Sequence, residues 1–411
     1  MAEKTNVPEI RFAGFTDPWE QRKLGNCGTT YGGLSGKTKE DFGHGNARFV
    51  PYTNVFDNPL TDTKRLETVE IDSSQNKVAY GDTFFTVSSE TPDEVGMSSV
   101  WLSDQDDVYL NSFCFGYRQD STFDPHYLAY MLRSSSIRSD LTLLAQGISR
   151  FNISKNKVME LSVPVPSAAE QKQIGQYFAR LDSLITLHQR KYDKLAQLKK
   201  SMLDKMFPKP GERFPEIRFA GFTDPWEQRK FSDMYVVNNE RNANCELGYD
   251  RTLSIATMTF NGGNGAADDS LSNYKVIRVG DIAFEGHTNK AHAYGRFVLN
   301  DAGDGLMSPR FSCLRPIVEQ RYSFWKYYIP REESMRPILV NATKSGTMMN
   351  ELVPDDLMHE SILVPCLAEQ EVIGNSLSQL DHLITLHQRM GPIFCFCAHG
   401  SRTNFASTLQ G

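Results

Sequence analysis

The sequence has no long hydrophobic run. Nowhere in its 411 residues do about 18 consecutive apolar residues occur, which is the length that a membrane-spanning helix needs. The opening residues, Met1 to Asn6, are followed by no apolar stretch, so no secretory signal peptide is encoded there. These absences exclude a membrane-spanning protein, and we expect a cytoplasmic one.

Cysteine is also scarce. The seven cysteines are odd in number and scattered along the chain, a distribution typical of reduced thiols rather than of a disulfide framework. Only Cys395-Phe396-Cys397-Ala398-His399 has a spacing that could suit a metal, because the other histidines and carboxylates form no ligand pattern. We expect the chain to bind no metal.

Motifs that hold cofactors are missing as well. The glycine clusters do not fit the G-x-x-x-x-G-K-[ST] phosphate loop, and no strand-loop-helix pattern supports a dinucleotide fingerprint. An adenine methyltransferase would need an Asn/Asp-Pro-Pro-aromatic motif to hold a flipped base, and Asn58-Pro59-Leu60 is not one. The sequence therefore predicts a non-catalytic chain with no cofactor of its own.

Net positive charge is lacking too. The 44 Lys and Arg residues are outnumbered by 50 Asp and Glu residues, which gives a formal net charge of −6. Because DNA phosphates are bound mainly by Lys and Arg, this balance counts mildly against a nucleic-acid binder. Between Glu170 and Lys205, however, eight basic residues face four acidic ones, which partly answers the objection.

What the sequence does contain is an internal repeat. The segment PEIRFAGFTDPWEQRK, Pro8 to Lys23, recurs without a change from Pro215 to Lys230. A second pair follows at a similar interval, LDSLITLHQR from Leu181 to Arg190 and LDHLITLHQR from Leu380 to Arg389. We call these repeated segments the frames. They show that the chain is a duplication with one layout in both halves.

Between the frames the two halves differ almost everywhere. They share only sparse marks, such as Gly81-Asp82 with Gly280-Asp281. Equal frames around unlike contents are what a modular reader needs if each unit docks alike but recognises something different. A duplicated structural domain that drifted is the alternative, but drift should have eroded the frames as well. The repeat therefore favours modular recognition.

The divergent segments predict mixed secondary structure. Short apolar runs such as Thr83–Val87 and Tyr274–Ile277 indicate strands between irregular loops. In the segment Pro8–Lys23, Thr16–Glu20 has a capping side chain followed by proline, which predicts a short helical turn with Trp19 packed beneath it. Trp226 is the equivalent residue in the second copy. We expect each half to be an α+β domain.

A heptad pattern predicts long helices. From Ala168 to about Phe207 an apolar stripe indicates one amphipathic helix of about 60 Å, at about 1.5 Å per residue. Glu369 to Arg389 repeats the start of the stripe, so we expect an antiparallel pair of coiled-coil helices. The residues assigned to helix packing or subunit docking are Ile174, Phe178, Leu181, Ile185, Tyr192, Leu195, Met202, Ile373, Leu377, Leu380 and Ile384.

The second helix has an atypical continuation. Met390-Gly391-Pro392 should stop it, and the residues that follow are unrelated to the first copy, as a reading-frame change would produce. The predicted layout is a first domain at 1–167, a long helix at 168–207, a second domain at 208–367, a truncated helix at 368–389 and an atypical tail at 390–411.

These features together resemble a known family. The segment NISKNKVMELSVPVPSAAEQKQIGQYFARLDSLI, Asn152 to Ile185, and its weaker second round are similar to the specificity subunit of type I restriction-modification enzymes. The resemblance covers residues 1 to about 389. It implies two target-recognition domains in pseudo-twofold repeat, each reading one half of a split DNA sequence. It also implies that the two helices set the gap and dock partner subunits.

The resemblance also implies partners. They are double-stranded DNA, two methyltransferase (modification) subunits and, in the full complex, restriction subunits. S-adenosylmethionine, ATP and Mg would be used by those partners and not by this chain. Two unlike readers at a fixed separation imply a bipartite, asymmetric target, as like readers imply repeated half-sites.

Candidate DNA-contacting residues come from loop-like stretches. Base edges are read by Arg, Lys, Asn and Gln, and phosphates are bound by Lys, Arg, hydroxyl groups and backbone amides. The candidates in the first half are Lys37, Lys39, Arg48, Tyr52, Asn54 and Arg150. The candidates in the second half are Arg241, Asn244, Arg251, Lys290, His292, Arg296 and Lys344.

Two other functions stay open. A self-sufficient modification enzyme would transfer methyl groups without a partner. A frame-altered, partly inactive specificity subunit or a coiled-coil adaptor is favoured by the acidic charge and the unrelated tail, and it would show no sequence preference even with partners present.

Overall fold

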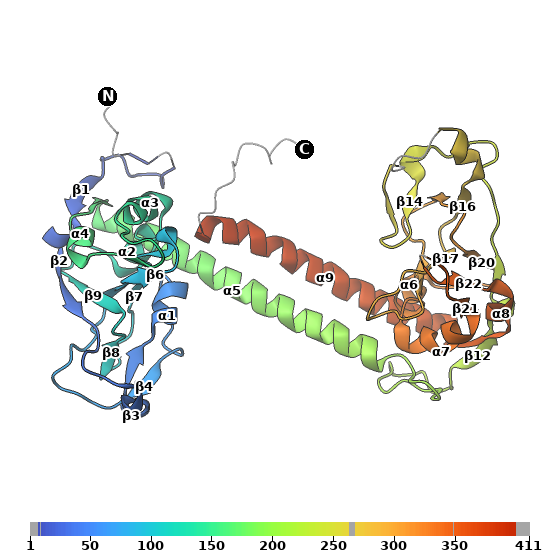
Figure 1. Ribbon diagram of the computed structural model, residues 1–411, viewed down its shortest axis with the longest axis horizontal. Coiled ribbons are helices and arrows are strands. Elements are labelled where there is room, and N and C mark those ends of the chain that lie inside the picture. Colours follow the sequence, from blue (N-terminus) through green and yellow to red (C-terminus); the bar gives the residue numbers. More distant parts are fainter. Residues whose placement is uncertain (1–6, 9, 263–267, 348, 400–411) are drawn as a thin grey trace. The chain divides into compact units, whose positions relative to one another are not determined.

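The structure, a computed structural model, describes residues 7–8, 10–262, 268–347 and 349–399, with side chains placed up to Arg389 except at 268–269 (Figure 1). The chain divides into two compact units. Unit 1 contains residues 1–187 together with 390–411, and unit 2 contains residues 188–389. Both units mix helices with short strands, which confirms the predicted α+β class. None of the described helices is long and apolar enough to span a membrane.

Unit 1 is built on a four-stranded sheet in the order β2-β9-β5-β7 and a three-stranded sheet in the order β4-β3-β8. Its core includes Phe85, Phe115 and Leu128, which are buried between the larger sheet and helices α2 and α3. The strands are β1 (Glu20–Lys23), β2 (Gly28–Gly32), β3 (Phe42–Val50), β4 (Glu67–Val69), β5 (Thr83–Thr86), β6 (Ser88–Ser89), β7 (Ser98–Val100), β8 (Val108–Leu110), β9 (Cys114–Gln119), β10 (Phe151–Asn152) and β11 (Ser162–Val165). The helices that begin in this unit are α1 (Tyr52–Asp57), α2 (Pro125–Met131), α3 (Ser135–Leu143), α4 (Lys155–Met159) and α5 (Ala168–Lys205).

Unit 2 has a matching four-stranded sheet in the order β13-β20-β17-β18. Its core is aromatic and includes Trp226, Phe324 and Trp325. The strands are β12 (Glu227–Lys230), β13 (Tyr235–Val237), β14 (Leu253–Ser254), β15 (Thr259–Phe260), β16 (Lys275–Ile277), β17 (Ile282–Glu285), β18 (Arg296–Leu299), β19 (Gly305–Met307), β20 (Cys313–Pro316), β21 (Thr343–Lys344), β22 (Glu351–Leu352) and β23 (Ser361–Val364). The helices are α6 (Tyr322–Tyr328), α7 (Glu332–Ala342), α8 (Pro354–His359) and α9 (Leu367–His399).

The repeated segments Pro8–Lys23 and Pro215–Lys230 both end in a strand. The helical turn predicted at Thr16–Glu20 is therefore wrong. Strand β1 begins at Glu20 and pairs antiparallel with β11, and the repeated residues of β12 pair in the same way with β23. The proline before each tryptophan fixes an extended entry into the strand, and the strand ladder then satisfies the backbone groups that a helix would have satisfied internally. The same four residues therefore pair with an equivalent strand in each unit, β11 or β23.

The two frame tryptophans differ in burial. Trp226 is 1% exposed and packs with Phe207, Phe324 and Tyr328. Trp19 is only half-buried. Phe207, which follows α5, supplies one of the rings around Trp226. The predicted packing is therefore confirmed for Trp226 and only partly for Trp19.

The predicted stop at Met390-Gly391-Pro392 is wrong, because α9 continues to His399. A proline inside a helix removes one hydrogen bond and costs about 3 kcal/mol, but it need not end a helix that is otherwise favourable. Helix α7 likewise contains Pro337 in its interior. The second helix is thus longer than the sequence pattern indicated.

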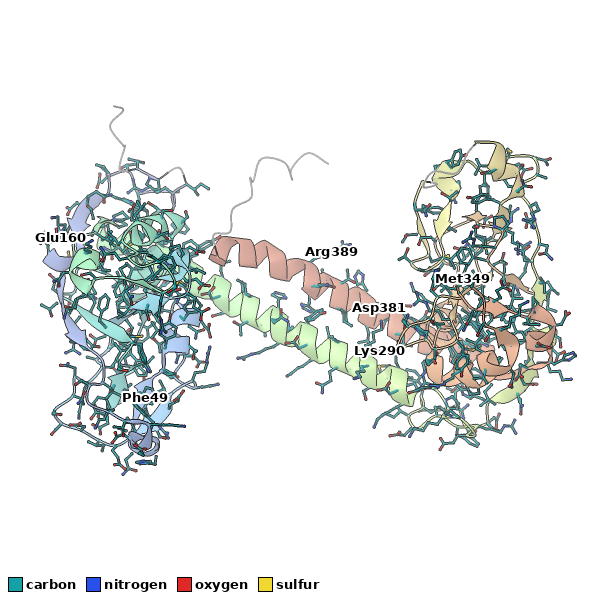
Figure 2. The ribbon with its side chains drawn as sticks, in the orientation of Figure 1. Phe49, Glu160, Lys290, Met349, Asp381 and Arg389 are labelled. Carbon is teal, nitrogen blue, oxygen red and sulfur yellow. The ribbon has the colours of Figure 1, made fainter. Side chains whose placement is uncertain are left out.

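Within unit 2, the part of α5 from His188 onward runs antiparallel to α9. His188 Nδ1 lies 2.8 Å from His387 Nδ1, and the Lys199 ammonium is paired with the Asp381 carboxylate (Figure 2). Residue numbers rise along one helix as they fall along the other. The predicted antiparallel arrangement is therefore observed in this unit.

The predicted helix-packing residues differ in burial. Ile373 and Leu377 are buried in the core of unit 2, against which Met202 packs, so they anchor α9 to its own unit. Ile174 and Phe178 pack in unit 1, where the Phe178 ring lies 5.4 Å from that of Tyr130. Leu380 is buried. The partly buried residues along the helices are Leu181, Ile185, Tyr192, Leu195 and Ile384.

The histidine pair makes stability depend on pH. Burial lowers the pKa of His387, and the nearby His188 and Lys191 lower it further. A histidine with a lowered folded-state pKa favours folding when neutral, so stability should fall as the pH drops below about 6.5, where the unfolded residue takes up its proton. We expect the midpoint of thermal unfolding to fall less between about pH 7.5 and about pH 5.5 in His387→Gln than in the wild type.

The matched control is His359→Gln, which replaces an exposed histidine of α8. Its unfolding midpoint should follow that of the wild type across the same pH range. An equal change of pH dependence in the two variants would contradict the role assigned to the pair.

Candidate nucleic-acid interface

Each unit contains a buried arginine-glutamate pair. It connects the repeated segment Pro8–Lys23 or Pro215–Lys230 to a long helix. In unit 1, the Arg11 guanidinium donates to Glu170 at 2.7 and 2.8 Å, and Trp19 Nε1 donates to the same carboxylate at 3.1 Å. In unit 2, Arg218 donates to Glu369 at 2.7 Å through both contacts. The two carboxylates are 0% and 1% exposed. Both pairs are therefore bidentate and shielded from water.

A second shared contact involves the Gly-Asp marks. In unit 1, Gly81 has a φ of +83°, which favours glycine, and the next residue, Asp82, is buried. Its carboxylate accepts from Arg118 at 2.9 and 2.6 Å and from the Tyr31 hydroxyl at 2.7 Å. Burial raises the pKa of Tyr31, so the phenol stays protonated and can donate. This contact joins the start of β5 to β2 and β9.

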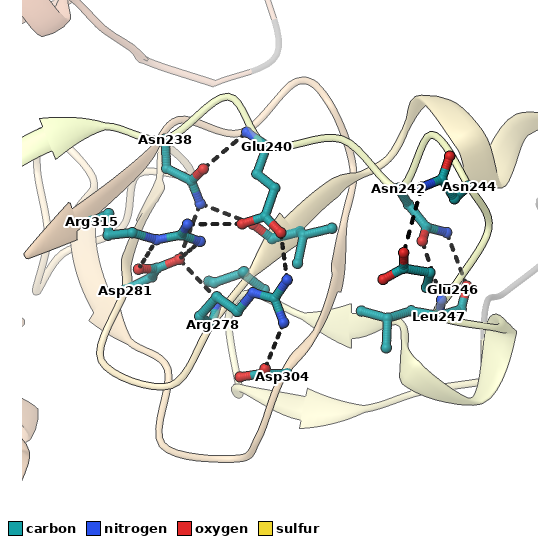
Figure 3. Close-up of polar contacts among 12 residues, drawn as sticks. Asn238, Glu240, Asn242, Asn244, Glu246, Leu247, Arg278, Asp281, Asp304 and Arg315 are labelled. Carbon is teal, nitrogen blue, oxygen red and sulfur yellow. Dashed lines mark hydrogen bonds and ion pairs between the residues drawn. The ribbon is translucent and has the colours of Figure 1, made fainter.

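Unit 2 repeats the arrangement with one substitution (Figure 3). Asp281 accepts from the Arg315 guanidinium at 3.0 and 2.9 Å, and from the Asn238 amide at 3.0 Å in place of a tyrosine. Arg315 also pairs with Glu240, and the two carboxylates together raise its pKa. The Gly-Asp marks are visible in the sequence, but their arginine partners were not among the predicted residues. An arginine at a similar interval after each mark was the signal that could have found them.

A cleft opens beyond the far end of β5 in unit 1. It has a volume of about 330 Å³. The Tyr52 hydroxyl donates to Ser88 O at 2.7 Å, the Tyr52 and Phe56 rings stack at 6.0 Å, and Phe113 is 60% exposed. The cleft thus offers aromatic faces beside charged groups. Its lining residues are Tyr52, Thr53, Phe56, Ser88, Ser89, Glu90, Glu94, Phe113 and Arg150.

Unit 2 has a cleft of about 340 Å³ at the corresponding place. His287, which lines it, follows Asp281 by six residues, as Ser88 follows Asp82. The lining chemistry differs, because this cleft is bordered by β14, β17 and β19 and contains fewer aromatic residues. Its lining residues are Thr252, Leu253, Ser254, Ile255, Ala256, Asn261, Tyr274, Glu285, His287, Leu306, Ser308 and Phe311.

Asn54 is a structural residue, so its prediction as a DNA contact is wrong. It is 0% exposed, and its amide donates to two backbone carbonyls at 2.9 Å while its side-chain oxygen accepts from the backbone of Asp62 at 3.0 Å. A base could be read only if these bonds broke, which would leave buried polar groups unpaired. The loop-like sequence concealed the short helix α1, which positions this side chain inward.

Several other predicted contacts are bonded within their own unit. Arg241, Arg251 and Arg296 each donate to a backbone carbonyl. Lys37 Nζ lies 2.8 Å from a carboxylate oxygen of Asp72. The remaining residues with a nearby carboxylate are Asn244 at 3.5 Å, His292 at 3.5 Å and Lys344 at 3.4 Å.

Four predicted residues have exposed side chains without a hydrogen bond or ion pair to any described residue. They are Lys39, Arg48, Arg150 and Lys290. Lys39 begins a short 3₁₀ helix, and Arg48 lies on β3. Lys290, labelled in Figure 2, comes three residues after His287, which lines the cleft of unit 2. Arg150 lines the cleft of unit 1. Tyr52 lines the same cleft with its hydroxyl already engaged.

Among the side chains that the structure describes, no group of three or more His, Cys, Asp or Glu residues could hold a metal ion. The side chains of Cys395, Cys397 and His399, where the sequence suggested a possible ligand spacing, lie outside that part. The described cysteines are all free thiols.

Comparison with known proteins bears on this arrangement. The sequence profile of the type I restriction modification DNA specificity domain matches residues 16–197. This part of the chain is similar to that family. The match begins within the first frame and ends within α5, so it contains the cleft of unit 1, Glu170 and the Asp82-Arg118 contact, whereas Arg11 lies before it.

The chain is also similar to curated specificity subunits. It is 23% identical to the type I restriction enzyme MjaX specificity subunit of Methanocaldococcus jannaschii over 65% of this chain and 63% of that protein. It is 23% identical to the StySPI specificity subunit of Salmonella potsdam over 66% of this chain and 61% of that protein. The alignments thus span less than two thirds of either relative.

A solved structure is similar along nearly the whole chain. The crystal structure of the type I restriction-modification system S subunit from M. genitalium is 12% identical in sequence. The superposition covers 96% of this chain and 97% of that chain, with a TM-score of 0.47.

The buried pair of unit 1 can be tested with Glu170→Gln. The variant removes the charge that Arg11 faces, and breaking a buried pair on one side costs about 3 kcal/mol or more. We expect the transition of unit 1 in urea unfolding to shift to lower urea. Glu160→Gln is the matched control, because Glu160 pairs with Lys23 on the surface and should contribute about 1 kcal/mol or less. Equal shifts in the two variants would show that the buried pair contributes no more to the free energy of unfolding than the surface pair.

Proposed function

We propose that this chain is the DNA-recognition subunit of a type I restriction-modification enzyme and reads a bipartite, asymmetric target. Each unit would read one half of it. The observation that carries this proposal is that one scaffold, with the same Arg-Glu and Asp-Arg contacts, holds two clefts of unlike chemistry. Two recognition domains that bind DNA in the same orientation but recognise different sequences would need the same internal contacts and different cleft residues.

The charge distribution is compatible with this role. The net charge of −6 belongs to the whole chain, whereas Lys39, Arg48, Arg150 and Lys290 have exposed side chains with no internal partner. Unpaired cations can release condensed counterions when they meet phosphates, which is the main source of affinity for DNA. Local cations, and not the overall balance, would then bring the DNA to the clefts.

The partners follow from the same proposal. Helices α5 and α9 would separate the two recognition domains, at 1–167 and 208–367, and dock two methyltransferase subunits, with restriction subunits added in the full complex. The chain would be non-catalytic. It would bind no cofactor itself, and S-adenosylmethionine, ATP and Mg would act in the partners. Such a complex would work in the cytoplasm, where the DNA is.

A second candidate is a partly inactive specificity subunit or an adaptor. The unrelated sequence after Arg389 favours it, because α9 continues there with residues that differ from the second half of α5. Such a chain would bind a partner through its helices and show no sequence preference.

The proposed function is tested by co-expressing the chain with its methyltransferase partner in a host that lacks DNA methylation. Mapping modified adenines genome-wide should reveal one split motif with two unlike halves. Neither protein alone should produce it. No split motif would favour the adaptor, and methyl transfer by the isolated chain would show a self-sufficient enzyme.

Salt dependence gives a separate test of the cations. Lys39→Ala and Lys290→Ala should each weaken binding of the assembled complex to target and non-target DNA alike. Each should lower the slope of log affinity against log salt by about 1, because one phosphate contact is lost. The control is Lys23→Ala, since Lys23 already pairs with Glu160. A loss of slope in the control equal to that in the variants would contradict the assignment.

A further inference from the structure

We infer that Tyr130 and Tyr327 are positioning residues, each of which fixes the orientation of its recognition domain on a long helix and thereby holds the gap between the two half-sites constant. The inference rests on the proposed function and makes it specific. Tyr130 belongs to α2 and Tyr327 to α6. We call the contact of α2 with α5, and that of α6 with α9, the joint of its unit.

Each joint contains the same tyrosine-aspartate hydrogen bond. The Tyr130 hydroxyl donates to Asp182 Oδ2 of α5 at 2.8 Å. The Tyr327 hydroxyl donates to Oδ2 of Asp381 of α9, labelled in Figure 2, at 2.6 Å. Burial raises the pKa of both phenols, and the hydrogen bond to the carboxylate raises it further. Both hydroxyls are therefore protonated near neutral pH and can donate.

A close backbone approach forms a second part of each joint. In unit 1, a Cβ on Gly175 of α5 would lie 2.5 Å from the backbone nitrogen of Tyr127. In unit 2, a Cβ on Gly374 of α9 would lie 2.5 Å from the backbone nitrogen of Phe324. In both units the joint tyrosine comes three residues after that nitrogen, and the joint aspartate comes seven residues after the glycine. The two joints are therefore built in the same register.

The tyrosine-aspartate bond is the contact farthest along the helix from the buried arginine-glutamate pair. In unit 1, Glu170, Gly175 and Asp182 follow one another along α5, and Asp182 lies about 18 Å from Glu170 at about 1.5 Å per residue. Two neighbouring contacts allow a domain to tilt, whereas a third one farther along the axis resists it. A tilt would move the reading surface along DNA, where successive base pairs are about 3.4 Å apart.

The tyrosine is the same in both units although its surroundings differ. Helix α2 reads PHYLAYM and α6 reads YSFWKYY, and only this tyrosine is shared when the two helices are aligned on their glycine contacts. The buried Leu128 of α2 corresponds to Trp325 of α6, so packing in the core accepts unlike residues. A hydrogen bond to the helix carboxylate, however, requires the hydroxyl. The shared tyrosine is therefore explained by the joint and not by the core.

In unit 2 the bond is part of a larger network. Asp381 Oδ1 pairs with Lys199 of α5, and the Lys199 ammonium lies 5.3 Å from the centre of the Tyr327 ring. Lys199 and Asp381 both belong to the long helices, whereas Tyr327 belongs to the recognition domain. The tyrosine hydroxyl is thus the group through which the domain joins this network.

The test uses the assembled complex with its methyltransferase partner, carrying Tyr130→Phe or Tyr327→Phe. Adenine mapping of the wild type should give two half-sites separated by one fixed gap. Both half-site sequences should be unchanged in each variant. The preference for that gap over gaps one base pair longer or shorter should fall about fivefold, as expected for one lost hydrogen bond. Asp182→Asn keeps an acceptor oxygen for the Tyr130 hydroxyl and should retain the wild-type preference.

The matched controls remove a tyrosine hydroxyl whose hydrogen bond stays inside the recognition domain. Tyr127→Phe is the control in unit 1, because this residue of α2 donates to Pro164 O at 2.8 Å. Tyr235→Phe is the control in unit 2, where the hydroxyl donates to Gln320 at 3.0 Å. Both controls should lower the midpoint of unfolding at least as much as the joint variants and leave the gap preference unchanged.

The outcomes separate the two levels of the argument. If the wild-type complex marks a split motif and the joint variants keep its gap as strictly as the wild type, the inference is overturned and the proposed function stands. The same holds if the controls relax the gap as much as the joint variants, or if the joint variants alter a half-site sequence. If the wild-type complex marks no split motif, the proposed function fails and the inference falls with it.

Discussion

In each unit a glutamate in the first turn of a long helix lies out of contact with water, and an arginine from the first frame neutralises it. In unit 1 the two residues are 159 positions apart in the sequence, and in unit 2 they are 151 apart. A buried carboxylate without its partner would be very costly, so the strand after the arginine and the helix that carries the glutamate must come together for either to be stable. The ends of each domain are thereby held together, and the sheets and clefts between them depend on that contact.

This dependence explains why the frames are equal while the contents differ. Arg11 and Arg218 need the same fork geometry to hold a carboxylate with two bonds, and a lysine could not reproduce it. The strand residues that follow also pair with equivalent partners in both units. Side chains beyond these contacts meet solvent at the clefts, where many residue types are compatible with the same backbone. The constraint is thus strongest at the domain ends and weakest where recognition is proposed.

The sequence predicted the α+β class, the duplication and the long helix from Ala168, because each rests on a repeat or a period that local physics imposes. It failed where tertiary partners decide the outcome. Thr16–Glu20 resembled a helix start, but β11 was available to pair with the strand that follows. Asn54 resembled a loop donor, but helix α1 turns it inward. Pro392 was assigned as a stop, but α9 continues past it.

The candidate site shows the same division. The Gly-Asp marks were visible in the sequence, yet Arg118 and Arg315 could be identified as their partners only once β9 and β20 lay beside β5 and β17. Residue type alone could not separate bonded cations from free ones, since Arg251 and Arg150 are alike in sequence and unlike in surroundings.

Residues 146–152 form a hairpin between α3 and α4, in which Gln146 and Asn152 exchange backbone hydrogen bonds. This construction has a consequence for how such a chain can evolve. Its shape comes from backbone bonds and from Gly147, so the residues at its tip contribute little to the free energy of unfolding. Most mutations lower the free energy of unfolding, and selection removes those that leave the protein too unstable to function. At this tip that constraint is nearly absent, so an exposed residue such as Ile148 can be replaced in an already stable molecule. A lineage can thus change this surface in single steps, without first passing through a poorly folded ancestor.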